Sequence, residues 1–219
     1  MKKLLLAIMV AVLAAAATSC DVSKEAKIKT LVGEYVQNHL FIPDSYDPVE
    51  FMIDSAFTPR LDPEFWEFMM DAREDLESAQ SDLSSCEFDI ESAERNMSYY
   101  EDMRYYGGLS SYERRAYNRA KDELAEHKAE KAEIEEEIRD IKSEIKDWMN
   151  VDPEFIGYIA IHSYRAKNNM GNVLMGSMIC FIDKDMTHVV TAYDPESMEF
   201  KRLTNFMEQI NDGDIDLDE

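Results

Sequence analysis

The sequence predicts an α+β protein in which a small helix-plus-antiparallel-sheet base domain is interrupted by a long antiparallel coiled-coil hairpin. Three features predict this fold: two long apolar series with alternating spacings of three and four, the Gly107-Gly108 pair between them, and strand-like segments on both sides. The 219 residues include 23 basic and 46 acidic side chains, which give a net charge of −23. An acidic surface argues against nucleic acid as a partner, because phosphate binding requires basic side chains.

Residues 1–19 resemble a bacterial lipoprotein signal peptide. Basic residues precede an apolar run from Leu4 to Ala17, and Ala17-Thr18-Ser19-Cys20 is similar to a lipobox. The resemblance implies that Cys20 carries palmitate-type acyl chains, which anchor the protein to the inner or the outer membrane of a cell envelope. An ordinary secretory signal is the alternative. We expect residues 20–27 to be a polar tether.

Two apolar series predict that residues 62–150 form two helices that return on each other. The first series is Met69, Ala72, Leu76, Ala79, Leu83, Cys86, Ile90, Ala93, Met97 and Tyr100. The second is Tyr117, Ala120, Leu124, His127, Lys131, Ile134, Ile138, Ile141, Ile145 and Trp148. Asp62-Pro63 predicts the start of the first helix, and Ser110 with Glu113 predicts a capping box at the start of the second.

A turn near Gly108 fixes which residues of the two helices face each other. It places Leu76 opposite Ile141 and Cys86 opposite Lys131. His127 is expected to be a polar register residue, since no second histidine or carboxylate is predicted to converge on it. We therefore expect no metal site and no cofactor. Cys86 in the hairpin and Cys180 in a strand are expected to be free thiols, without a disulfide.

Tyrosine and arginine gather around the predicted turn. These residue types are enriched at binding hot spots, and the stretch is locally basic within an acidic chain. The candidate docking residues are Arg104, Tyr105, Tyr106, Tyr112, Arg114 and Arg115. The alternative is that the tyrosines close the end of the hairpin and the arginines balance nearby acidic residues.

Residues 28–61 and 151–211 are expected to form the discontinuous base domain. An apolar stripe from Ile28 to Leu40 predicts a helix, and another stripe ending at Ile210 predicts the last one. The predicted strands are Val49–Phe57, Phe155–Ala166, Val173–Ile182 and Val189–Tyr193. Neither piece alone has enough strands to bury a sheet face, so one sheet must include both. Residues 212–219 read as an acidic tail.

The base domain also resembles a group of small Bacteroidota envelope lipoproteins. Asp44-Ser45-Tyr46 and the stretch His162-Ser163-Tyr164-Arg165-Ala166-Lys167-Asn168 with Gly171 are similar to motifs of that group, including its RAKN-x-x-G strand hairpin. The resemblance implies an envelope location and a helix-plus-sheet fold, and no activity. Asp54-Ser55-Ala56 also resembles an O-glycosylation sequon of exported proteins in that phylum.

No nucleotide-binding, nucleophile-elbow, zinc-protease or CxxC motif occurs in the sequence, so a non-enzymatic role is expected. Our leading hypothesis is a lipid-anchored structural and interaction protein whose hairpin tip docks an envelope protein. One alternative is that the hairpin serves only as a spacer or as the seam of a homodimer. Another is a ligand-binding or hydrolytic protein that uses a polar face of the base sheet. His162, Arg165 and Lys167 are the candidates for that pocket, although they can also be the outward half of a strand.

Overall fold

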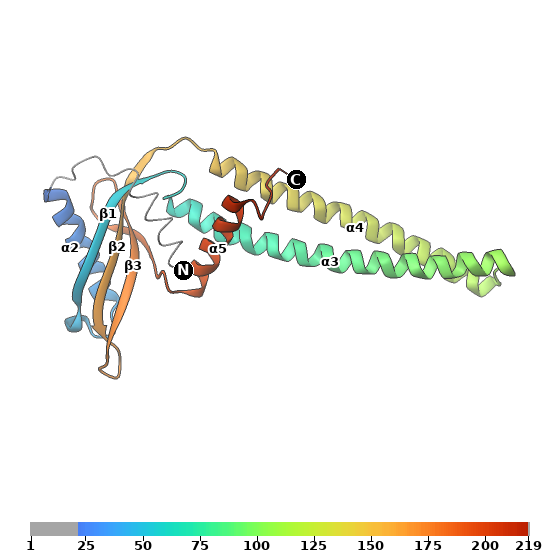
Figure 1. Cartoon of the computed structure of the whole chain (residues 1–219), viewed down its shortest axis with the longest axis horizontal. Coiled ribbons are helices and arrows are strands. Elements are labelled where there is room, and N and C mark those ends of the chain that lie inside the picture. Colours follow the sequence, from blue (N-terminus) through green and yellow to red (C-terminus); the bar gives the residue numbers. More distant parts are fainter. Residues whose placement is uncertain (1–21, 219) are drawn as a thin grey trace. The chain divides into compact units, whose positions relative to one another are not determined.

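The structure, a computed structural model, describes residues 22–218 (Figure 1). The elements in chain order are α2 (Val22–His39), the 3-10 helix η1 (Pro43–Ser45), β1 (Asp47–Phe57), α3 (Pro63–Tyr106), α4 (Ser111–Met149), β2 (Phe155–Lys167), β3 (Val173–Asp183), β4 (Val189–Tyr193) and α5 (Met198–Asp212). The signal peptide and Cys20 lie outside the described residues. Across residues 22–218, no helix is both long enough and apolar enough to span a bilayer.

The described chain divides into two compact units. The base unit contains the residues up to Met70 together with Asp147–Asp216, and the helical unit contains Asp71–Lys146 with the last residues of the chain. The base unit is larger than the predicted base domain of 28–61 and 151–211, because it includes the first turns of α3 and the last residues of α4. Residues 22–27 of the expected tether are helical, and they form the start of α2.

One antiparallel sheet with strand order β1-β2-β3-β4 forms the centre of the base unit. The four predicted strands are confirmed, with ends that differ by no more than two residues. β1 begins two residues early, at Asp47, and so includes Pro48. Because β1 is an edge strand, a proline without an N–H group is tolerated there. The pairing of β1 with β2 joins the two sequence segments that flank the helical unit.

Both faces of the sheet are covered. On one face, α2 packs its buried side chains against alternate residues of β2 and β3, in a core formed by Ile28, Val32, Val36, Tyr158, Ala160, Cys180 and Ile182. On the other face, Trp66 from the first turn of α3 contacts Phe181 of β3 and Phe200 of α5, with ring centroids 4.9 and 5.4 Å apart. Figure 1 shows the sheet between α2 and α5.

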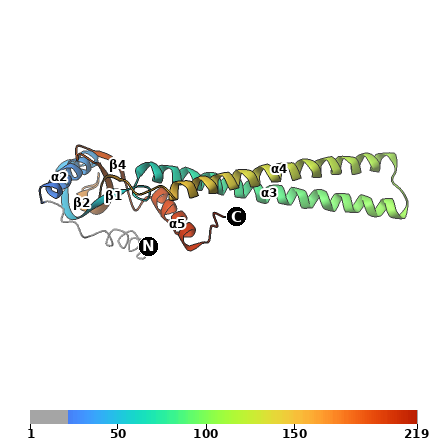
Figure 2. The same ribbon diagram turned by 90° about the horizontal axis from the view of Figure 1, so that it is seen from above.

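In the helical unit, α3 and α4 run antiparallel and pack against each other (Figure 2). Every member of both predicted apolar series is buried or half-buried, while most residues between them are exposed. Lys131 Nζ lies 2.7 Å from Glu87 Oε1, and Glu87 is next to Cys86, the residue predicted to face Lys131. This pair places Lys131 in the neighbourhood of Cys86, as the predicted register requires, while the register itself stays a prediction.

The expected helix starts are confirmed. The Asp62 carboxylate accepts a hydrogen bond from Glu64 N at 2.9 Å, and α3 begins at Pro63, the residue between them. Ser110 and Glu113 form a reciprocal capping box, in which Ser110 N donates to the Glu113 carboxylate at 2.7 Å and Glu113 N donates to Ser110 Oγ at 3.3 Å. These bonds satisfy N–H groups that the first turn of a helix leaves without a partner.

Candidate functional site

The predicted docking residues lie at the turn between α3 and α4, and we call them the tip patch: Arg104, Tyr105, Tyr106, Tyr112, Arg114 and Arg115. All six are exposed. Tyr105, Tyr106 and Tyr112 are 85, 84 and 75% exposed, and the rings of Tyr105 and Tyr106 meet edge to face at 5.1 Å. Aromatic side chains this exposed contribute nothing to the core of the helical unit.

Other tyrosines near the turn do close the end of the helix pair. Tyr100 and Tyr117 are half-buried, and the Tyr117 hydroxyl donates to Glu101 Oε1 at 3.4 Å. The alternative interpretation of the sequence, in which tyrosines close the end of the helix pair, therefore applies to Tyr100 and Tyr117. The tyrosines of the tip patch differ from them because at least three quarters of each side chain stays exposed, even where Tyr105 and Tyr106 contact each other.

His162 is fully buried in the base unit, with no exposed surface. Its ring stacks on Phe51 at a centroid distance of 3.8 Å. Nδ1–H donates to the Glu50 carbonyl and Nε2 accepts from the Tyr46 hydroxyl, both at 2.8 Å. Burial lowers the pKa of His162, although its hydrogen bond to Glu50 opposes the shift. Both ring nitrogens are satisfied, so this histidine is a neutral structural residue.

The structure does not bring His162, Arg165 and Lys167 together into a pocket. Consecutive residues of a strand point to opposite faces, so His162 points toward α2 while the two basic residues are exposed on the other side of β2. Arg165 Nη1 lies 3.7 Å from Asp47 Oδ2. Both sequence interpretations of His162 are wrong, because it is neither in a polar pocket nor on the outward half of the strand. Only the side chains of Arg165 and Lys167 point away from α2 and are exposed.

A groove of about 830 Å³ lies in the base unit, and sequence reasoning missed it. It runs between the end of β1, the α4–β2 connection and α5, and Ser55 of the resembled sequon is among its lining residues. Its apolar wall includes Phe57, Leu203 and Met207, and its rim carries the carboxylates Asp54, Asp152, Glu208 and Asp212. Arg60 also lines the groove, so the lining combines an apolar wall with charged side chains of both signs.

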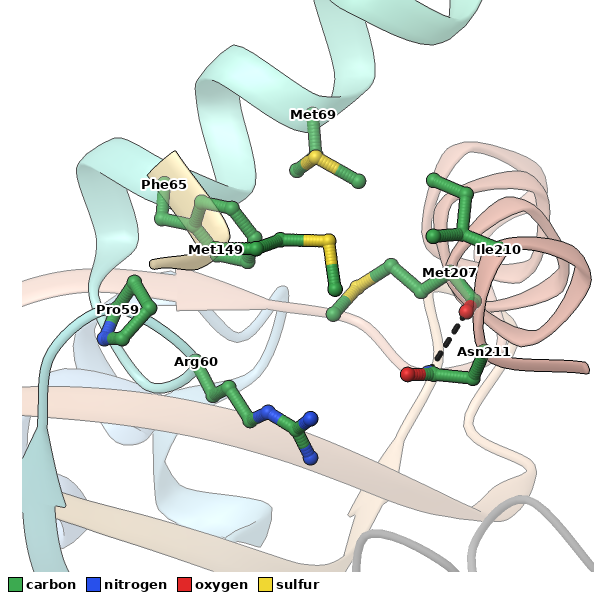
Figure 3. Close-up of a pocket in the computed structure, with 8 residues that line it drawn as sticks. All are labelled: Pro59, Arg60, Phe65, Met69, Met149, Met207, Ile210 and Asn211. Atoms are coloured by element: carbon green, nitrogen blue, oxygen red, sulfur yellow. Dashed lines mark hydrogen bonds between the residues drawn. The ribbon is translucent and has the colours of Figure 1, made fainter. Parts of the chain in front are cut away.

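A small cavity of about 50 Å³ shares part of this wall (Figure 3). The side chains of Met69, Met149 and Met207 converge in it, from α3, α4 and α5. Methionine is flexible and polarizable, so it adapts to irregular space. No sequence motif marks this region, because its lining comes from three regions that are distant in the sequence, around residues 59–69, 149 and 207–211.

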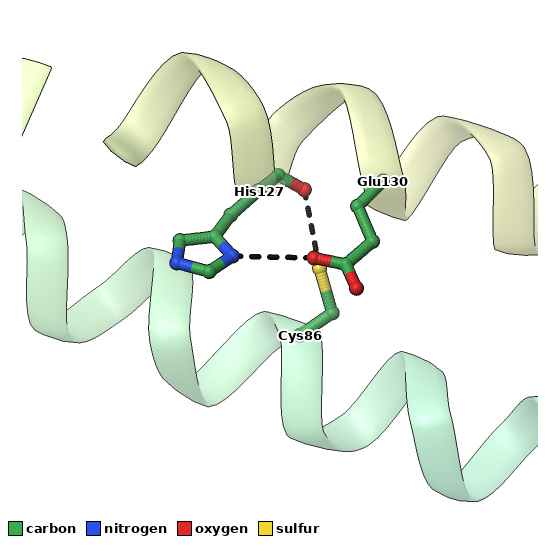
Figure 4. A group of neighbouring side chains, drawn as sticks. All are labelled: Cys86, His127 and Glu130. Carbon is green, nitrogen blue, oxygen red and sulfur yellow. Dashed lines mark hydrogen bonds and ion pairs between the residues drawn. The ribbon is translucent and has the colours of Figure 1, made fainter. Parts of the chain in front are cut away.

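The helical unit contains a cluster of ligand-type side chains from α3 and α4, formed by Cys86, His127 and Glu130 (Figure 4). His127 Nδ1 lies 3.2 Å from Glu130 Oε2, and the Cys86 thiol donates to the His127 carbonyl at 3.1 Å. The expectation that no carboxylate converges on His127 is wrong. The missed signal is the spacing His127-x-x-Glu130, which places both side chains on one helix face.

The two described cysteines have no disulfide partner and are both buried. Burial raises the pKa of the Cys180 thiol to about 12, because the thiolate cannot be solvated in the core. Burial, together with the nearby Glu130 carboxylate, also raises the pKa of Cys86. Both are therefore protonated thiols at neutral pH.

No protein-family model, curated protein or solved structure compared with this chain matches it. The likeness to Bacteroidota lipoproteins therefore remains an expectation from the sequence.

Proposed function

We propose that this chain is a lipid-anchored protein of the cell envelope that acts as a structural and interaction module. In this proposal α3 and α4 form a coiled-coil hairpin, and the tip patch docks an acidic surface of a protein partner. The observation that carries the proposal is the exposure of three tyrosines among arginines at one end of the helical unit.

The coiled-coil assignment is supported by the alternating burial along both helices and by pairs between them. Lys128 Nζ lies 2.9 Å from Glu94 Oε1, in addition to the Lys131–Glu87 pair. Opposite charges beside an apolar seam favour one pairing of helices over others. Within the helical unit, the part of α3 from Asp71 to Tyr106 extends about 54 Å at about 1.5 Å per residue, long enough for many turns of an apolar seam.

The docking assignment is supported by charge and residue type. Residues 99–119 contain four arginines and three acidic residues, whereas the whole chain has a net charge of −23. An acidic partner would be attracted to this end of the helical unit and repelled by most of the remaining surface. Tyrosine and arginine also contribute more binding energy than other residue types when a partner buries them.

The test is affinity capture from native envelopes, followed by binding measurements with the purified captured protein. We expect an acidic protein whose Kd rises at least tenfold, about 1.4 kcal/mol, when Tyr105→Ala and Tyr106→Ala are combined. Arg114→Glu with Arg115→Glu should also abolish most of the salt dependence of binding.

Arg139→Glu is the matched control, because it makes the same kind of charge reversal at an exposed position of α4. It lies 24 residues from Arg115, or about 36 Å along the helix. The tip variants must keep wild-type helicity by circular dichroism. Equal affinity of the tip variants, the control and the wild type would exclude the tip patch as the docking surface.

The alternative of a pocket formed by His162, Arg165 and Lys167 is not proposed, because β2 directs His162 and the two basic residues to opposite faces.

A further inference from the structure

Three side chains with different metal-ligating atoms meet between α3 and α4. The Cys86 sulfur, an imidazole nitrogen of His127 and a carboxylate oxygen of Glu130 all lie within 4.8 Å of one another. Figure 4 shows the three side chains in the space between the helices, with the cysteine on α3 and the other two on α4. Among residues 22–218 this is the one group of three such residues at that spacing.

The spacing of the ligand atoms suits a tetrahedral ion. Bonds of about 2.0–2.1 Å to nitrogen and oxygen place two ligand atoms of a tetrahedron about 3.3 Å apart. His127 Nδ1 and Glu130 Oε2 are already 3.2 Å apart, held by their i, i+3 relation on one helix. The Cys86 thiol lies beside the same turn, since it donates to the His127 carbonyl at 3.1 Å. The site requires the Cys86 sulfur to turn from that carbonyl toward the ion.

The surroundings favour a cation. Glu87, Asp89 and Glu130 all act on the Cys86 thiol with negative charge. The neighbouring cation Lys131 is paired with Glu87 at 2.7 Å and with Glu135 at 3.6 Å, which limits its repulsion of an ion. Cys86 is buried, His127 is half-buried and Glu130 is exposed, so the cluster extends from the interior of the helix pair to the solvent-exposed Glu130.

The ligand types select the metal class. A thiolate, an imidazole and a carboxylate together are typical of Zn²⁺ and of ions that substitute for it, such as Co²⁺. Ca²⁺ and Mg²⁺ require an all-oxygen shell, which these residues do not provide. Three protein ligands leave the fourth position of a tetrahedron open to water or to a further ligand.

We propose that Cys86, His127 and Glu130 form a zinc-class metal site that links α3 to α4 within the helical unit. Binding releases the thiol proton of Cys86 to solvent. The proton that His127 Nδ1 shares with Glu130 moves to Nε2, so that Nδ1 and the Glu130 carboxylate both bond to the ion. This site is independent of the tip patch and of any partner that the tip patch binds.

The test uses the full chain, reduced and freed of metal with a chelator, and titrates it with Co²⁺ alone. We expect one equivalent to produce the near-ultraviolet thiolate-to-cobalt charge-transfer band and the intense visible bands of tetrahedral Co²⁺. Zn²⁺ should displace Co²⁺ and remove both signals. Cys86→Ala should abolish the charge-transfer band, and Glu130→Gln should weaken Zn²⁺ binding at least tenfold.

Glu137→Gln is the matched control, because Glu137 lies seven residues further along the same face of α4 and is also an exposed glutamate. It should bind Zn²⁺ as the wild type does. His127→Ala, checked for helicity by circular dichroism, gives a second ligand variant if Cys86→Ala perturbs the helix pair. Absence of the charge-transfer band in the wild-type chain, or equal Zn²⁺ affinity of Glu130→Gln and Glu137→Gln, would overturn the proposal.

Discussion

Replacing Trp66 with alanine tests how the base unit is stabilised on the face of the sheet opposite α2. Trp66 is only 4% exposed, and its ring contacts Phe181 of β3, Tyr193 of β4 and Phe200 of α5 at centroid distances of 4.9, 5.3 and 5.4 Å. Its indole N–H donates to the Arg60 carbonyl at 2.7 Å. One side chain thus connects α3, two strands and α5.

The expected loss follows from area and from the hydrogen bond. A buried aromatic side chain removes about 150–250 Å² from water, which at about 25 cal/mol per Å² amounts to about 4–6 kcal/mol. Measured losses for tryptophan to alanine in cores are about 3–5 kcal/mol, since the site relaxes in part. We therefore expect Trp66→Ala to lower the free energy of unfolding by about 4 kcal/mol. Trp66→Phe should lower it by about 1–2 kcal/mol, because a ring remains but the hydrogen bond is lost.

Urea unfolding followed by tryptophan fluorescence measures this effect in the base unit, which contains both tryptophans of the chain; in the Trp66 variants the signal comes from Trp148 alone. Trp148 also belongs to the base unit, where its ring lies 5.5 Å from that of Phe68. Phe88→Ala is the control, because Phe88 is 65% exposed and its removal should change stability by less than about 0.5 kcal/mol. A loss below about 1 kcal/mol for Trp66→Ala would refute the view that the start of α3 is part of the core of the base unit.

Three further predictions concern the sheet and its turns. Although burial opposes it, hydrogen bonds from His188 N, the Thr187 hydroxyl and Thr187 N lower the pKa of Asp183 from 3.8 to about 2. The stability that this carboxylate contributes is therefore complete above about pH 4 and is lost as the pH falls toward 2. Asp183→Asn should remove this fall of the urea midpoint in acid. An unchanged fall in the variant would show that another group causes it. Burial lowers the pKa of His162 below its usual 6.5, so protonation favours the unfolded chain and stability should fall as the pH drops below about 6.5. His162→Phe should flatten this fall in thermal melts recorded across that range, and an equally steep fall in the variant would locate the effect elsewhere. Gly157 has φ 148°, and an added Cβ would lie 2.1 Å from the Ile182 carbonyl oxygen, so Gly157→Ala should cost about 2–3 kcal/mol in urea unfolding. Gly171→Ala, in an open turn with φ 82°, should cost only about 1 kcal/mol, and similar losses at both positions would show that the close approach to β3 does not matter.

Most of the fold could be predicted from local patterns in the sequence. The alternation of three and four places Leu76 and Ala79 on one face of α3 whatever that face contacts, and both are buried. The capping residues Asp62 and Ser110 accept from N–H groups two and three residues further along the chain, so their role could be predicted without the tertiary structure.

The candidate sites depended more on contacts between distant segments. The tip patch could be predicted, because its residues lie within twelve positions around one turn and their exposure follows from the end of the helix pair. The role of His162 could not, because Tyr46 and Glu50, which satisfy its ring nitrogens, are more than 100 residues away. Alternation along a strand shows which residues share a face, but not which face is covered.

The sequence by itself determined the helix pair, the strands, their order along the chain and the charge of the tip patch, because these depend on periodicity and on neighbours a few residues apart. Only the tertiary structure decided that α2 and α5 cover opposite faces of the sheet, that a groove opens beside α5, and that Cys86 meets His127 and Glu130. These features depend on the distance and orientation of side chains from separate elements, which no single local pattern encodes.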